Sequence, residues 1–210
     1  MAEIDYGIKA VETEYAGTIF RSRLEARWAA FFDVLGWPWV YEPFDLDGWF
    51  PDFLLEPVYM GFEHLSASGP AGRNRPVLVE VKPISRFCPE TAKRISNALV
   101  KSENELEPLL LGLSPLFDLP YYETAVGWLG EDYQDPNPES PRHYFEYAVL
   151  RSGDEIPGNT KIKADFCHEN GHWKHRITGY YDGTLGGLKK NVCQKYWGEA
   201  CNKVKYRPNQ

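Results

Sequence analysis

The chain has 210 residues and a net charge of −7, with a pI of about 5.3, and its length suits one domain or one domain with a small appendage. Hydrophobic residues make up 43% and aromatic residues 15%, which is enough for a packed core and argues against disorder. No apolar run reaches the length of a membrane span, the first residues lack a secretory signal, and four irregularly spaced cysteines do not suggest a secreted disulfide framework. We therefore expect a cytoplasmic protein without a membrane partner.

The charge is unevenly distributed along the chain. Residues 1–60 hold four Lys or Arg and eleven Asp or Glu, whereas residues 161–210 hold ten Lys or Arg and four Asp or Glu, a surplus of six positive charges. The overall acidity argues against tight, non-specific DNA binding. An acidic, metal-binding N-terminal part beside a basic C-terminal segment is nevertheless compatible with a nuclease.

A first helix is predicted over residues 17–35. Its apolar residues recur at the three- and four-residue spacing of one helix face; they are Phe20, Leu24, Trp28, Phe31 and Leu35. Gly36, followed by Trp37 and Pro38, is expected to end this helix.

Strand-like runs and a second helix follow. Strands are predicted at residues 39–42, 49–55, 77–81, 109–113, 124–129 and 144–150. The second helix begins at Pro89 and runs to about residue 105, with Ile95, Ala98 and Leu99 facing inward, and residues 56–76 are interpreted as an exposed insertion. The order helix, three strands, helix, strand predicts an α/β fold built on a mixed sheet.

The C-terminal part differs in character from the rest. Residues 161–166 and 173–181 are predicted to pair as a hairpin, and residues 189–204 to form a basic helix. We therefore divide the chain into a core, 1–155, and a basic C-terminal hairpin-plus-helix extension, 156–210.

Three ionisable residues lie on apolar, strand-forming segments. Asp52 is flanked by apolar residues, and Glu80 and Lys82 are two apart on one strand, so that both point to the same face. Such groups are costly there unless they hold one another or a metal. Because Mg²⁺ takes oxygen ligands and keeps several waters, Asp52 and Glu80 are candidate ligands.

Two more roles complete this candidate site. Lys82 would orient or help deprotonate the attacking water and stabilise the charge that develops on phosphorus. Glu25, at the edge of the apolar stripe of the first helix, could be a third metal ligand. The residue types thus predict a site that cleaves phosphodiester bonds.

Each of these residues also has a structural interpretation. Ser22 and Glu25 fit a helix-capping box, and Asp52 after a proline fits a turn. Glu80 and Lys82 fit a solvent-facing pair on a half-exposed strand. The metal site is favoured because it explains all four positions in one order.

The order of a helical Glu25, then Pro51-Asp52, then Glu80-Val-Lys82 resembles the PD-(D/E)XK nuclease superfamily. Residues 20–33 are similar to the start of phage and bacterial members, and the resemblance covers about residues 15–115. It implies a restriction-endonuclease-like mixed β-sheet core flanked by helices, DNA cleavage with Mg²⁺ or Mn²⁺, and these four residues as the site. The long segment 56–76 departs from the pattern, and the choice between endonuclease and exonuclease action stays open.

Basic residues supply candidate contacts to nucleic acid. They are Arg86, Lys93, Lys189, Lys190 and Lys195. The alternative for each is an ordinary solvated surface position.

The C-terminal cysteines and histidines suggest a zinc site, since thiolate and imidazole suit Zn²⁺. The candidate ligands are Cys167, His172, Cys193 and Cys201. Their spacing contains no Cys-x2-Cys pair, so a hairpin with surface histidines and buried free cysteines is favoured. Similar nucleases often end in a small zinc-ribbon-like segment, so the resemblance also allows the C-terminal extension to be a degenerate form of that segment.

Together these features predict a metal-dependent nuclease that hydrolyses DNA, with phage or prophage DNA processing as its setting. The alternative is a catalytically inactive module on the same fold that binds nucleic acid or protein. A zinc-stabilised interaction protein is a third hypothesis.

Overall fold

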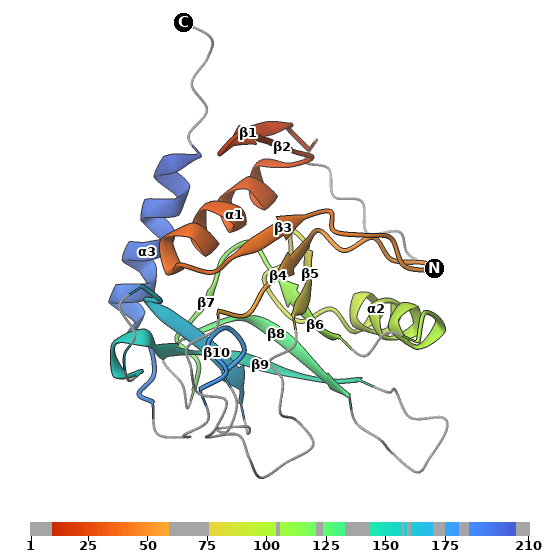
Figure 1. The fold of residues 1–210 in the computed structure, drawn as a ribbon. Helices are drawn as coiled ribbons and strands as arrows, with labels where there is room; N and C mark the ends of the chain where they lie inside the picture. Colours follow the sequence, from red (N-terminus) through yellow and green to blue (C-terminus); the bar gives the residue numbers. More distant parts are fainter. Residues whose placement is uncertain are drawn as a thin grey trace, which may run out of the picture.

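A curled mixed sheet forms the centre of the computed structural model, which describes residues 10–58, 76–103, 106–120, 124–132, 143–156, 158, 161–169, 175–180 and 185–204 (Figure 1). Within these residues the sheet has eight strands, in the order β10-β9-β8-β6-β5-β4-β3 with β7 paired to β8. The strands are β3 (Trp39–Tyr41), β4 (Phe53–Leu55), β5 (Val77–Val81), β6 (Glu107–Leu111), β7 (Leu116–Phe117), β8 (Thr124–Asp132), β9 (His143–Ser152) and β10 (Ala164–His168). Only the β5–β6 pair is parallel among the pairs described.

In the described residues, three helices cover the two faces of this sheet: α1 (Arg23–Leu35), α2 (Pro89–Lys101) and α3 (Lys190–Lys203). Successive side chains of β5 point to opposite faces of the sheet, so this strand contributes to two hydrophobic cores. Val77 and Val79 pack in the first core with α1 and α3, whereas Leu78 packs in the second core with α2. All five residues of β5 are buried. The mixed α/β class predicted from the element order is therefore confirmed.

The first helix begins later than predicted. Residues 18–20 form strand β2 (Thr18–Phe20), which pairs with β1 (Thr13–Tyr15). Ala16 and Gly17 both have positive φ, 50° and 80°, and reverse the chain between the two strands. Ser22 then caps α1 by accepting the N–H of Glu25, and Gly36, with φ of 82°, ends the helix as predicted.

Several strand boundaries also differ from those predicted. The strand predicted at 49–55 is only Phe53–Leu55, because Leu46 and Trp49 close a tight hairpin of their own and Pro51 follows. The strand predicted at 109–113 runs from Glu107 to Leu111. The strand β7 and the short 3-10 helix Gly153–Glu155 had no signal in the pattern.

The predicted C-terminal hairpin is wrong in its described part. β10 pairs antiparallel with β9, and residues 176–178 form a turn instead of a partner strand. The predicted helix at 189–204 is confirmed as α3. Trp197 of α3 packs on Trp28 of α1, with ring centroids 4.8 Å apart, so this segment shares both the sheet and the core with the residues before 155.

The described helices are short or polar. In the part of the chain that the structure describes, no helix is long and apolar enough to cross a membrane.

Candidate functional site

One end of the sheet gathers the four candidate site residues. Asp52 directly precedes β4, Glu80 lies near the end of β5, and Lys82 follows β5. Since β4 and β5 are antiparallel, with Phe53 opposite Val79, the start of one strand lies beside the end of the other. The first turn of α1 brings Glu25 to the same end, next to the end of β3.

The carboxylate of Asp52 is buried, with only 3% of the residue exposed. Its Oδ2 accepts the backbone N–H of Val81 at 2.7 Å, and its Oδ1 accepts a hydrogen bond from the guanidinium of Arg21. Burial, together with the nearby carboxylate of Glu80 and then that of Glu25, raises the pKa of Asp52 to about 7, although the Val81 N–H and Lys82 oppose the rise. The negative charge of Glu80 therefore disfavours ionisation of the buried Asp52 carboxyl.

Glu80 is equally buried, with 2% of the residue exposed, and three donors hold its carboxylate. Its Oε2 accepts the indole N–H of Trp49 at 2.7 Å. Its Oε1 lies 2.7 Å from both Lys82 Nζ and Arg94 Nη2. The solvent-facing pair considered from the sequence is thus wrong for Glu80, because a solvent-facing carboxylate does not need three protein donors.

Glu25 has both a capping role and a place beside the site. Its N–H donates to Ser22 Oγ at 3.2 Å, which confirms the Ser22 half of the predicted capping box. The Glu25 Oε1 accepts from the Ser22 hydroxyl at 2.7 Å. Its Oε2 accepts from Tyr41 Oη at 2.6 Å. Arg21 Nε lies 4.0 Å from this same oxygen, so Arg21 links Glu25 to Asp52.

The suitability of this cluster for a metal depends on Asp52 and Glu80. Among the described residues, no group of three or more His, Cys, Asp or Glu side chains stands close enough to hold a metal ion, so Glu25 does not join the other two as a third ligand. Two buried carboxylates that repel each other nevertheless suit Mg²⁺, which commonly takes one or two carboxylates and completes its shell with water and substrate phosphate. Asp52 and Glu80 are thus the two residues that would hold such an ion.

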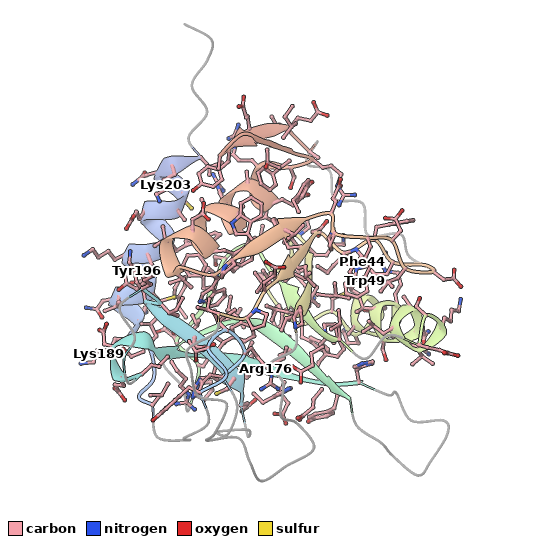
Figure 2. The ribbon with its side chains drawn as sticks, in the orientation of Figure 1. Phe44, Trp49, Arg176, Lys189, Tyr196 and Lys203 are labelled. Carbon is pink, nitrogen blue, oxygen red and sulfur yellow. The ribbon has the colours of Figure 1, made fainter. Side chains whose placement is uncertain are left out.

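The candidate nucleic-acid contacts fall on two separate surfaces. Arg86 and Lys93 are exposed, Arg86 before α2 and Lys93 next to Arg94 on it. Lys189 and Lys195 are exposed at α3, while Lys190 Nζ pairs with Asp118 Oδ1 at 2.7 Å. Figure 2 shows Lys189, Tyr196 and Lys203 at one side of the molecule and Trp49 at the other.

The predicted zinc ligands do not form one cluster in the described residues, and His172 lies outside them. Cys167 is buried on β10, and Cys193 is buried on α3 against the first core. Burial raises the pKa of the Cys193 thiol to about 12 and also raises the pKa of the Cys201 thiol. These thiols are therefore protonated, free cysteines in separate surroundings.

The prediction of surface histidines is wrong for His168 and His175, which are both buried. His168 Nε2 and Nδ1 lie 3.8 Å from the carboxylates of Glu131 and Glu146. Burial, assisted by the positive charge of Arg176, lowers the pKa of His168 to about 3, so its ring is neutral.

Three residues of the site were not predicted from the sequence: Arg21, Tyr41 and Trp49. Arg21 carried a weak signal, since it lies four residues before Glu25 on the predicted helix. Trp49 carried none, because an indole in an apolar run is normally a core residue, and here it is both core and hydrogen-bond donor.

Comparisons of the chain with protein-family models, with curated proteins and with solved structures gave no match.

Proposed function

We propose that the protein is a Mg²⁺-dependent nuclease that hydrolyses DNA phosphodiester bonds. The observation that carries this proposal is the juxtaposition of two buried carboxylates, Asp52 and Glu80, with Lys82 Nζ 2.7 Å from Glu80. Buried charges of one sign are retained at a cost, and such pairs concentrate at functional sites.

The element order adds support for a restriction-endonuclease-like core, which we propose as the finer fold. Helix α1 is followed by the antiparallel strands β3, β4 and β5, then by α2 and by β6, which is parallel to β5. Glu25 lies on the first helix, Asp52 directly precedes the second of these strands, and Glu80 and Lys82 lie on and just after the third. This is the chain order on which the resemblance rests. The phage or prophage setting is supported by that resemblance alone.

The chain's own groups suggest how the reaction would proceed. Asp52 and Glu80 would hold the ion, and Trp49 fixes the orientation of the Glu80 carboxylate through its indole N–H. When bound, Mg²⁺ supplies Lewis-acid polarisation of the phosphate and lowers the pKa of water. Lys82 would donate a hydrogen bond to the attacking water and stabilise charge on the phosphate oxygens. Arg86 and Lys93 would contact neighbouring phosphates.

The test is cleavage of linear, circular and single-stranded DNA with and without Mg²⁺ or Mn²⁺. We expect Asp52→Asn, Glu80→Gln and Lys82→Ala each to lower the cleavage rate by roughly 100-fold or more, the scale on which essential acid, base or metal-binding groups act. Asp118→Asn is the matched control for the carboxylates, because Asp118 is exposed and its carboxylate pairs with Lys190 on α3. Cleavage that survives all three substitutions would overturn the proposal.

A second candidate function is a catalytically inactive module that binds nucleic acid or protein. The observation that favours it is the complete pairing of both carboxylates by protein donors: Arg21 and the Val81 N–H on Asp52, and Trp49, Lys82 and Arg94 on Glu80. Calorimetric titration with Mg²⁺ separates the two functions, since an inactive module would show no ion binding that depends on Asp52 and Glu80.

A further inference from the structure

We propose that Arg21 and Arg94 are exchangeable counter-ions of the candidate site. Each guanidinium pairs with one buried carboxylate while no divalent ion is bound, and transfers to substrate phosphate when an ion takes its place. This inference rests on the proposed function and deepens it, because it names two phosphate-binding residues and a reason why metal and DNA should bind together.

The geometry places one arginine on each of the two carboxylates. Arg21, which precedes α1, donates from Nη2 to Asp52 Oδ1. Arg94, on α2 at the opposite face of the sheet, donates from Nη2 to Glu80 Oε1 at 2.7 Å. The two guanidinium groups therefore approach the carboxylates from two sides and neutralise charge that a divalent cation would otherwise neutralise.

Exposure distinguishes these arginines from structural ones. The side chains of Arg21 and Arg94 are 54% and 49% exposed, although the oxygens that they contact are buried. Arg176, by contrast, is only 6% exposed where it pairs with Glu107. Arg21 and Arg94 could leave their carboxylates by rotation into solvent, whereas Arg176 could not leave Glu107 without unpacking.

Electrostatics give the direction of the exchange. A guanidinium on a carboxylate competes with a cation for the same oxygen and disfavours a second positive charge nearby. Once an ion holds the oxygen, the planar guanidinium is free to bind phosphate, to which it fits in a bidentate manner. Arg21 would stay at the site during this change, because its Nε also pairs with exposed Glu42 Oε1 at 2.9 Å.

The test measures Mg²⁺ affinity of the intact protein by calorimetry without DNA. We expect Arg21→Ala and Arg94→Ala each to tighten Mg²⁺ binding by roughly three- to tenfold, the scale of a partly exposed ion pair. Lys101→Ala is the control for loss of one positive charge, because Lys101 is on α2 but pairs with Asp47 at 3.7 Å instead of a site carboxylate. Its Mg²⁺ affinity should stay within twofold of the wild type.

A second readout is binding to a DNA oligonucleotide in Ca²⁺, which permits affinity to be measured without Mg²⁺. The same two alanine variants should bind DNA at least about tenfold more weakly, since each loses a charge-assisted contact to phosphate. Arg94→Lys should restore the weaker Mg²⁺ binding of the wild type without restoring full DNA affinity, because lysine keeps the charge and lacks the fork. Thermal unfolding confirms that each variant is folded.

The outcomes separate this inference from the proposed function. If Mg²⁺ binding depends on Asp52 and Glu80 but is unchanged or weaker in Arg21→Ala and Arg94→Ala, the counter-ion exchange is wrong and the nuclease proposal stands. If neither the wild type nor the arginine variants bind Mg²⁺, both are wrong.

Discussion

Two buried aspartates of this protein, Asp165 and Asp52, differ in the kind of group that donates hydrogen bonds to them. Asp165 on β10 is fully buried and accepts hydrogen bonds from the backbone N–H groups of Phe166, Ile177 and Thr178 and from the Thr178 hydroxyl. Asp52 accepts hydrogen bonds from one backbone N–H and from the guanidinium of Arg21, whose side chain is half-exposed. The first carboxylate is held by main-chain groups that cannot leave, and the second by a side chain that can.

This difference separates a structural carboxylate from a candidate functional one. The donors to Asp165 tie the turn at residues 176–178 to strand β10, so this carboxylate has a structural role. The donors to Asp52 and Glu80 include three cations from separate elements, and two carboxylates of like charge remain side by side. Burial alone therefore does not identify a site, whereas exchangeable donors around repelling charges suggest one.

The largest expected effect is the loss of stability when the structural carboxylate, Asp165, is removed. Asp165→Ala removes the acceptor of three backbone N–H groups and should lower the free energy of unfolding by about 3–5 kcal/mol, because each buried donor left without a partner costs about 1–3 kcal/mol. Urea denaturation measures this loss. Asp154→Ala, at an exposed position of the short 3-10 helix, is the control and should change stability by less than about 0.5 kcal/mol. If Asp165→Ala changed stability as little as Asp154→Ala, Asp165 would not be a structural carboxylate.

A smaller effect is expected from the indole donor of the candidate site. Trp49→Phe leaves Glu80 Oε2 without its donor at 2.7 Å and should cost about 1–3 kcal/mol of stability, as for a lost bond to a charged acceptor. It should also weaken Mg²⁺ binding, because the carboxylate loses its fixed orientation. Trp37→Phe is matched, since the Trp37 indole N–H donates to the Ala164 carbonyl at 2.6 Å. That variant should lose stability while keeping the Mg²⁺ affinity of the wild type.

The pH dependence of stability gives a third test. The pKa of Asp52 rises from its ordinary value of 3.8 to about 7 on folding, so the folded state binds this proton more tightly than the unfolded chain does. The stabilisation is therefore fully present below about pH 4 and is lost as the pH rises through 7, with a slope of at most about 1.4 kcal/mol per pH unit. Asp52→Asn should remove this slope, whereas Asp118→Asn should keep it. Denaturation midpoints between pH 4 and 8 measure both, and an unchanged slope in Asp52→Asn would contradict the assignment.

The smallest expected effect concerns the two basic surfaces. Lys93 lies next to Arg94 on α2, and Lys93→Ala should weaken DNA binding by roughly two- to fivefold. The slope of the logarithm of DNA affinity against the logarithm of salt concentration should fall by about the value for one phosphate contact. Lys195→Ala removes an exposed charge from α3, which lies across the molecule from α2 (Figure 1), and should change the affinity of a short duplex by less than about twofold. Equal effects would indicate that the DNA path includes α3.

Much of the fold follows from local pattern. The buried strand Val77–Val81, the helix beginning at Pro89 and the basic helix near the C-terminus were predictable, because continuous apolar runs and helical spacing are properties of neighbouring residues. The errors lie where distant residues decide. Thr18–Phe20 continued the apolar period of α1 but forms a strand with β1, and β10 pairs with β9 instead of with residues 173–181.

The sequence by itself determined which residues carry charge on apolar strands, and so named Asp52, Glu80 and Lys82 as candidates. Only the tertiary structure decided what surrounds them: Arg21 on Asp52, with Trp49 and Arg94 on Glu80. The physical reason is that charge on a strand is a property of one position, whereas the partner that compensates it is brought by chain segments 14 to 31 residues away. Spacing along the chain does not predict these contacts, because they form only when two helices pack against one sheet.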